Sequence, residues 1–315
     1  MNHLDRNQIL GILFGISATV IWAGWPVLSK IATNNHLQPY DITMLRFSIS
    51  GLVLFPLFIM RFAKLKAIAA KGVVLAFGAG APYVLVGTSG MAYAPTSHFS
   101  IIMPTSMLLF TTLGSVLWLG DKLTLARILG ISFIIAGVVF VGGNSLGGLA
   151  LKDTFKGDFM FLMCGFLWSI YTVLARYWKI NPWDATVLVS MVSIVLYVPF
   201  YLYQFGDQIL AVETETLLVQ GLYQGVFASI GALYLYSKAI SLLGASKGAI
   251  FSVLLPPLSL LLGSFLLEEV LTWVEVGGLI LVCLGMLFAF EIFRLPTHLL
   301  AANKVIPQQD RESDV

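Results

Sequence analysis

Two pairs of aromatic residues have the type and spacing to hold a solute inside a helical protein. Trp22 and Trp25 stand three residues apart in one apolar segment, and Trp168 and Tyr171 repeat that spacing in another. Residues three apart share one face of a helix. Such faces could line a cavity from two sides and bind an apolar or amphiphilic solute, with indole N–H and phenol O–H groups as polar contacts. Packing between helices or against lipid explains the same spacing equally well.

Ionisable and amide side chains near the segment ends are further candidates. His98 begins one apolar segment, and Lys247 stands at the corresponding place later in the chain. Histidine titrates near neutrality, so His98 would bind substrate or a coupling proton if it faces a cavity. Snorkelling to lipid headgroups is the simpler interpretation for both residues. Gln224 shares a helix face with Gln220 and would bind either substrate or a neighbouring helix.

Charged residues are scarce within the apolar segments. All 16 acidic residues fall in loops, tails or segment ends, so we expect no carboxylate at mid-membrane for a sodium site or a proton relay. Arg46 lies inside the second segment, where we expect it to bond carbonyl groups at a helix end. Proton coupling would therefore have to use His98 or backbone groups.

Prolines interrupt several apolar segments. Each removes a backbone donor and frees a carbonyl, which lipid cannot satisfy and which must face protein or a wet cavity. Pro82 with adjacent Tyr83 is the pair that we expect on the translocation route, whereas a structural kink is the simpler role for the others. The expected helix kinks lie at Pro26, Pro82, Pro104, Pro256 and Pro257.

No pattern in the sequence indicates a cofactor, a metal site or catalysis. Cys164 and Cys283 lie in apolar segments, where a small buried hydrophobic side chain is the default interpretation. The glycine pairs at 142–143 and 147–148 are not followed by Gly-Lys-Ser/Thr, so a phosphate-binding loop is not expected. A membrane-embedded enzyme would need a nucleophile with its base, or a metal site, within the apolar segments. Of the four histidines only His98 borders the expected membrane cavity, so this class is unfavourable.

Long apolar helices must position these residues. The 315 residues are 58% hydrophobic and 11% charged, compared with about 25% charged residues in soluble domains. Each apolar run has the roughly 20 residues that a membrane-spanning helix needs, and the first is too long for a signal peptide. The ten runs are expected at 7–29, 40–60, 72–93, 97–119, 124–142, 157–177, 184–204, 215–237, 247–267 and 273–291.

The placement of lysine and arginine predicts the orientation, because cationic loops stay on the cytoplasmic side. With both termini in the cytoplasm, all but four of the 18 cations fall in cytoplasmic segments, the exceptions being Lys30, Lys152, Lys156 and Arg46. We expect a multi-pass protein of the bacterial inner membrane with cytoplasmic N and C termini. Its expected partners are the lipid bilayer and a small-molecule substrate. No nucleic-acid partner is expected, and the sequence leaves open whether the protein forms a homodimer.

The two halves of the chain repeat one another. Ile21-Trp22 precedes Pro39-Tyr40-Asp41 as Leu167-Trp168 precedes Pro182-Trp183-Asp184, and Asp121 with Gly130 and Gly137 parallels Glu269 with Gly278 and Gly285. Halves of five helices must insert with opposite topology, an arrangement that encloses a midplane site in secondary transporters. We therefore expect an all-α integral membrane fold of ten transmembrane helices in two inverted five-helix repeats. The expected units are a first repeat (1–145), an external linker (146–156), a second repeat (157–293) and a cytoplasmic tail (294–315).

These features resemble the EamA-type families of the drug/metabolite transporter superfamily. The resemblance covers roughly residues 9–291 and is carried by the Ile/Leu-Trp pairs, by Arg46-Phe47 and by Pro256, thirteen residues before Glu269. It implies an exporter of amino acids or other small metabolites or, in related families, of nucleotide-linked sugars. The chain departs from the pattern at Leu108, where a proline is usual. It also lacks the glutamate that the small multidrug relatives carry within the membrane, which disfavours a permanently cationic drug as substrate.

The leading interpretation is an alternating-access exporter of a neutral or zwitterionic solute such as an amino acid, held in a cavity around Trp22 and Trp168. The alternative within the same class is a carrier of an anionic solute, a sugar phosphate or nucleotide-linked sugar. That solute would be read by Lys30, Arg46, Lys238 and Lys247, which lie near the membrane faces. A membrane-embedded enzyme is the least favoured class.

Overall fold

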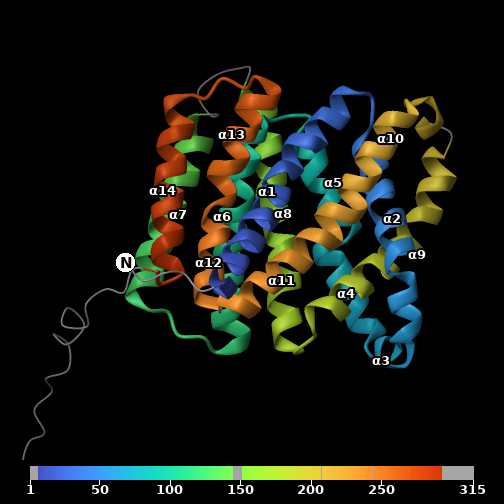
Figure 1. Cartoon of the computed structure of the whole chain (residues 1–315). Coiled ribbons are helices and arrows are strands. Elements are labelled where there is room, and N and C mark those ends of the chain that lie inside the picture. The colour runs from blue at the N-terminus through green and yellow to red at the C-terminus, as the bar shows by residue number, and fades with distance from the viewer. Residues whose placement is uncertain (1–5, 145–150, 207, 244, 293–315) are drawn as a thin grey trace, which may run out of the picture.

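The chain folds into a bundle of helices packed side by side, as the computed structural model shows (Figure 1). The structure describes residues 6–144, 151–206, 208–243 and 245–292, and these ranges contain no β-strand. The predicted tail, 294–315, lies outside the described residues. The predicted linker, 146–156, is described only from residue 151, where the next helix has already begun.

The helices follow one another with short connections. They are α1 (Arg6–Asn34), α2 (Pro39–Met60), α3 (Phe62–Ala67), α4 (Ala69–Ala79), α5 (Ala81–Gly90), α6 (Thr96–Leu119), α7 (Leu125–Asn144), α8 (Leu151–Tyr177), α9 (Pro182–Phe205), a 3-10 turn η1 (Gln208–Ala211), α10 (Thr214–Gly221), a π-helical segment η2 (Leu222–Gly231), α11 (Ala232–Leu243), α12 (Ala245–Val253), α13 (Leu255–Leu267) and α14 (Trp273–Ala289). Each predicted apolar run coincides with one of these helices or with a consecutive group of them.

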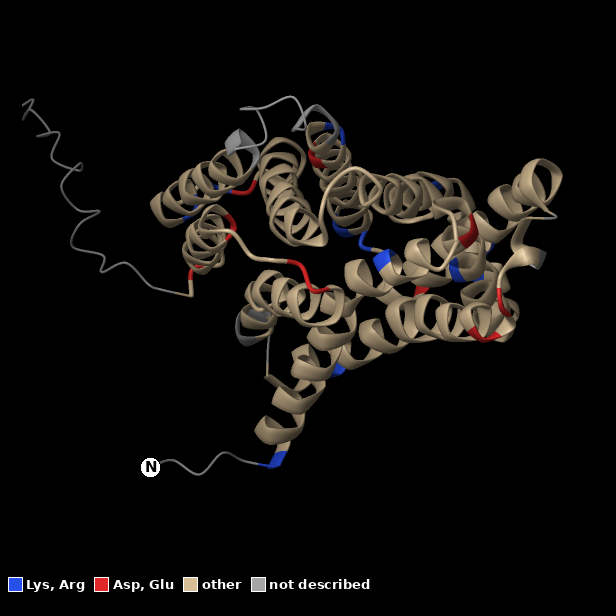
Figure 2. Ribbon diagram, turned by 90° about the horizontal axis from the view of Figure 1, so that it is seen from above, with Lys and Arg blue, Asp and Glu red and all other residues tan. Residues whose placement is uncertain are grey.

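Length and composition allow most of these elements to cross a membrane. Within the part of the chain that the structure describes, eight helical stretches are long and apolar enough, and two shorter apolar helices cover Leu125–Val141 and Trp273–Ala289. Large apolar side chains stay exposed on the outside of the bundle, among them Leu52, Phe265 and Trp273. Lys, Arg, Asp and Glu occupy only short stretches among the helices (Figure 2). The chain is therefore a multi-pass membrane protein whose exterior suits lipid.

Three of the expected spans are interrupted. One breaks at Gly80 between α4 and α5, and Pro82 then lies in the first turn of α5. Another breaks at Leu254 between α12 and α13, so that Pro256 and Pro257 lie in the first turn of α13. Proline fits at these positions because the first turn of a helix has no internal partner for its N–H. The third interruption is η2, which no proline marks. By contrast, α1 and α6 continue through Pro26 and Pro104.

The helices α7 and α14, which lie at one edge of the bundle, contact each other through glycines (Figure 1). A Cβ on Gly130 would lie 2.6 Å from the carbonyl oxygen of Gly285, and a Cβ on Gly137 would lie 2.9 Å from that of Gly278. Only glycine permits such backbone contact. The four glycines that repeat in the two halves of the sequence thus meet in this one seam.

Candidate functional site

A row of aromatic rings crosses the bundle from α1 through α5 to α8. The ring of Trp25 stacks on Tyr83 with centroids 5.9 Å apart, and Tyr83 lies 4.8 Å from Trp168. Tyr171 follows at 5.5 Å from Trp168. Four candidate binding residues are therefore brought together, and we call Trp25, Tyr83, Trp168 and Tyr171 the aromatic row.

The break between α4 and α5 positions Tyr83 in this row. A Cβ on Gly80 would lie 2.3 Å from the carbonyl oxygen of Ala76, so the chain can turn in this way only at a glycine. Just before the break, a Cβ on Gly78 would lie 2.8 Å from the backbone nitrogen of Tyr171. The backbones of α4 and α8 therefore touch beside the row, and α5 restarts with Tyr83 facing Trp168.

Trp22 lies apart from the row. Its indole nitrogen donates to the carbonyl oxygen of Ala228 at 3.2 Å, and its ring packs on Tyr236 with centroids 5.3 Å apart. Both contacts connect α1 to η2 and α11. The structure thus does not bring Trp22 and Trp168 together as the expected cavity requires. Trp25, not Trp22, lies beside Tyr83.

The amide of Gln224 fixes the ring of Trp25 from η2. The indole nitrogen of Trp25 donates to Gln224 Oε1 at 2.8 Å, and Gln224 Nε2 donates to Ser29 Oγ at 3.1 Å. Gln220 Nε2 donates to the carbonyl oxygen of Leu28 at 3.0 Å. Both glutamines therefore form hydrogen bonds between helices, which is one of the two roles expected for them. Gln224 also contacts the aromatic row through its bond to Trp25.

Arg46 is a buried cation at the edge of the row. The residue is 8% exposed, and its Cζ lies 5.7 Å from the ring of Trp25. Its Nε has no hydrogen-bond partner, and no hydrogen bond or ion pair of its guanidinium occurs among the described residues. The expected bonds to helix-end carbonyls are therefore wrong. Among the described residues, Tyr83, Tyr223 and Cys164 are the titratable groups that interact with it, and none of them is a carboxylate.

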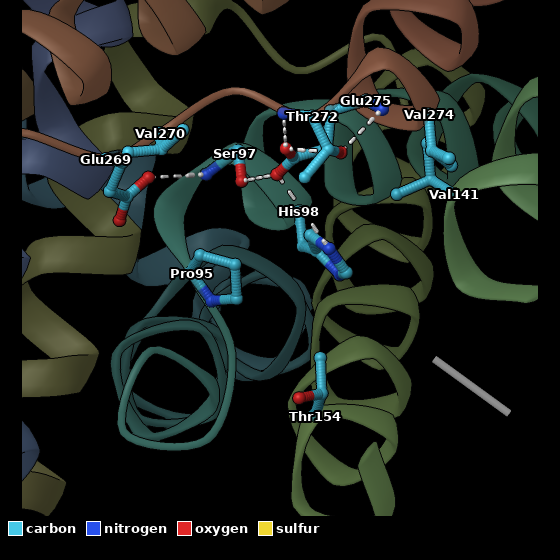
Figure 3. Close-up of a pocket in the computed structure, with 10 residues that line it drawn as sticks. All are labelled: Pro95, Ser97, His98, Val141, Thr154, Glu269, Val270, Thr272, Val274 and Glu275. Atoms are coloured by element: carbon cyan, nitrogen blue, oxygen red, sulfur yellow. Dashed lines mark hydrogen bonds and ion pairs between the residues drawn. The ribbon is translucent and has the colours of Figure 1, made fainter. Parts of the chain in front are cut away.

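A second group of polar residues surrounds His98 where α6 begins. His98 Nδ1 lies 2.7 Å from Asp158 Oδ1, and His98 Nε2 lies 4.0 Å from Glu275 Oε1. The Ser97 hydroxyl donates to Glu275, whose other oxygen accepts from the backbone nitrogen of Thr272 at 2.7 Å. Ser97, His98, Thr272 and Glu275 border a cavity of about 320 Å³ between the starts of α6 and α8 and the connection from α13 to α14 (Figure 3).

The carboxylates beside His98 correct the expectation that histidine would act without an acid. Asp158 lies inside α8 and Glu275 in the first turn of α14, and both side chains are buried. In the sequence, both carboxylates lie near the end of an apolar segment, where charged residues are ordinary. Because the three helix ends converge in space, a histidine and two carboxylates form one cluster. The side chain of Lys247, at the corresponding end of α12, lies outside the described residues.

The equivalent acids Asp121 and Glu269 have different partners. Glu269 accepts from the backbone nitrogen of Thr96 at 3.0 Å and from its hydroxyl at 2.8 Å, so it caps the start of α6. Asp121 instead accepts from Arg176 at 2.7 Å, and this guanidinium holds the pKa of the carboxyl below its usual value. The repeat is therefore preserved in sequence but not in these contacts.

Comparisons with known proteins agree with the helical architecture. The model of the EamA-like transporter family matches residues 9–143 and, a second time, residues 155–290. YyaM of Bacillus subtilis (strain 168), named an uncharacterized transporter, is 24% identical over 235 residues, which cover 72% of this chain and 73% of YyaM. YoaV of the same organism, with the same description, is 24% identical over 88% of this chain and 94% of its own. A crystal structure that is 21% identical covers 89% of this chain and 96% of its own with a TM-score of 0.58, which shows a shared fold.

Proposed function

Because the chain belongs to the EamA-like transporter family, we propose that it carries a small organic metabolite across the membrane by alternating access. The aromatic row carries this proposal, since it joins rings of α1 and α5 with rings of α8 directly beside a broken helix. Aromatic rings beside irregular backbone are suited to a solute that must be held and then released. Export of a neutral or zwitterionic solute such as an amino acid is the direction and class that we propose first.

We further propose ten membrane spans in two inverted repeats. Two separate matches to the family model, one in each half, support this arrangement. The glycine seam supports it too, because Gly130 contacts Gly285 whereas its own equivalent in the repeat is Gly278. Such exchanged pairing is expected when two equivalent helices are related by a two-fold axis. The short helices α7 and α14 would then be the fifth and tenth spans.

Alternating access would use the interrupted spans as hinges. The breaks at Gly80 and Leu254 and the π-helical η2 are places where a helix can bend without losing a long run of hydrogen bonds. At one end of the bundle, Glu269 in the connection after α13 accepts a hydrogen bond from the start of α6. Near the start of α9, Asp184 accepts from Arg61 at 2.7 Å and from Lys64 at 2.5 Å. Opening either end would have to release such ties.

A screen of radiolabelled metabolites in proteoliposomes tests the transport proposal. We expect saturable uptake of at least one small organic solute that competes with its unlabelled form. Empty liposomes and liposomes with heat-inactivated protein are the controls. Failure of every amino acid, organic acid and sugar phosphate to move faster than in empty liposomes would count against a carrier.

The proposed orientation makes a labelling prediction. Cysteines introduced at Lys66 and Arg127 should be shielded from a membrane-impermeant thiol reagent in intact cells, whereas cysteines at Lys152 and Glu213 should be labelled. The parent chain, with only Cys164 and Cys283 in its apolar helices, is the background control. The reverse pattern would overturn the cytoplasmic placement of both termini.

The cluster around His98 makes a coupling prediction. If protons drive the cycle, flux in proteoliposomes should respond to an imposed pH gradient, and His98→Gln should remove that response while exchange between equal pools of substrate survives. Glutamine keeps a hydrogen-bonding group toward Asp158 but cannot titrate near neutrality. Flux that ignores the gradient in the parent protein would make it a facilitator.

A further inference from the structure

The guanidinium of Arg46 lacks an anionic partner among the described residues, although it is buried within the bundle. Arginine within a membrane span is costly, and it normally pairs with an acid, bonds carbonyls or reaches toward the interface. None of these explains Arg46, because its guanidinium has no described bond and the residue is 8% exposed. The contact with Trp25 compensates only part of the charge.

We propose that Arg46 binds the carboxylate of the transported solute, and that the aromatic row holds the apolar remainder of that solute. This inference rests on the proposed transport function and changes its substrate class to small solutes with one carboxylate, which include amino acids but also carboxylic acids without an amino group. Guanidinium and carboxylate match in geometry and charge, since two parallel N–H donors can meet two oxygens. The ring of Trp25 lies next to both the guanidinium and Tyr83, so a solute bound to Arg46 would extend along the row.

The surrounding charges favour one carboxylate over a phosphate. A phosphate ester carries more than one negative charge near neutrality and is usually held by several cations. Lys30, another cation of the expected anionic set, donates to the carbonyl oxygen of Met91 at 2.5 Å, and Lys238 lies 5.8 Å from the ring of Tyr234. Arg46 is thus the cation at the aromatic row among the described residues.

The same surroundings make an amino group dispensable. Binding of an ammonium group is strongest at a carboxylate, and the titratable groups around Arg46 are two phenols and a thiol. These groups are neutral near pH 7 in their ordinary range. A carboxylic acid without an amino group should therefore bind as well as an amino acid with the same side chain, which a site built for zwitterions would not allow.

Three probes with one carbon skeleton test this assignment on the purified full-length chain in detergent. They are 3-phenylpropionate, its amide 3-phenylpropanamide and the amine 3-phenylpropylamine, titrated by isothermal calorimetry with tryptophan fluorescence as a second readout. We expect saturable binding of the carboxylate and at least about tenfold weaker binding of the amide and the amine, because both lose the charged hydrogen bonds. Equal binding of amide and carboxylate would overturn the proposal, and so would equal competition by acetate, because the row would then add nothing.

Variants of Arg46 provide the matched comparison. Arg46→Met should weaken 3-phenylpropionate binding at least about tenfold, and Arg46→Lys should fall between, because lysine keeps the charge but loses the two-pronged donor. Lys30→Met, which removes a cation bound to a backbone carbonyl, should leave this binding unchanged. Unchanged binding in Arg46→Met would overturn the proposal. If that variant does not fold, the three probes on the parent protein still decide.

Failure of this inference and failure of the transport function are separable. Binding of 3-phenylpropionate that depends on Arg46, without flux of any solute in proteoliposomes, would remove the carrier function and keep the carboxylate site. Flux of an uncharged solute that Arg46→Met leaves intact would remove the carboxylate site and keep the carrier.

Discussion

Replacement of Trp168 by alanine should reduce substrate flux at least tenfold, which corresponds to about 1.4 kcal/mol of lost interaction. Trp168 contacts Tyr83 on one side and Tyr171 on the other, so its removal interrupts the aromatic row at the junction of α5 and α8. The initial rate of uptake in proteoliposomes, at equal amounts of incorporated protein, is the measurement.

Two other tryptophans provide the comparison for Trp168→Ala. Trp118→Ala removes a ring of the same size that is exposed outside the bundle, and its flux should match the parent protein. The sequence repeat alone predicts the same loss for Trp22 as for Trp168. From its contacts with Ala228 and Tyr236 we expect a smaller effect of Trp22→Ala. Parental flux in Trp168→Ala would assign the row to packing.

Gly285→Leu should abolish most of the folded protein. A Cβ at this position would already lie 2.7 Å from the carbonyl oxygen of Gly130 and 2.9 Å from the backbone nitrogen of Ile134. Backbone atoms cannot turn away as a side chain can, so the leucine must push α7 and α14 apart. We expect a destabilisation of at least about 3 kcal/mol, the upper part of the range for overpacking. The measurement is the yield of monodisperse protein and its thermal half-loss in detergent.

Gly277→Leu is the matched control, because it places the same residue in the same helix. A Cβ there would first meet Cε1 of the Phe140 ring at 3.0 Å, and a ring can rotate. Both substitutions also change helix propensity equally. If the two variants had the same yield and thermal stability, the glycine seam would not hold α7 against α14.

The long apolar helices could be predicted from the sequence because lipid imposes simple demands on the chain. A helix must cover the hydrocarbon thickness and satisfy its own backbone, which fixes both its length and its apolar character. The breaks before Pro82 and Pro256 followed from proline's missing donor. The π-helical η2 escaped prediction, because its residues include no proline and fit a regular helix equally well.

The candidate site was predicted only in part, because spacing identifies a helix face but not the neighbour of that face. Trp22 and Trp25 are equivalent by spacing, yet packing sends Trp22 to Tyr236 and Trp25 to Tyr83. The partners of His98 were missed because Asp158 is 60 residues and Glu275 well over a hundred residues away in the chain. Arg46 could have been identified as a candidate site residue from the sequence, because it is a cation inside an apolar run.

The unpaired charge of Arg46 has an electrical consequence. An empty carrier holds one positive charge at the row, whereas a carrier that has bound a monocarboxylate there is neutral at the same place. Moving one elementary charge across the whole membrane field changes the energy by roughly 2.3 kcal/mol per 100 mV of membrane voltage. The voltage would therefore bias the reorientation of the empty protein and leave that of the loaded protein nearly unaffected.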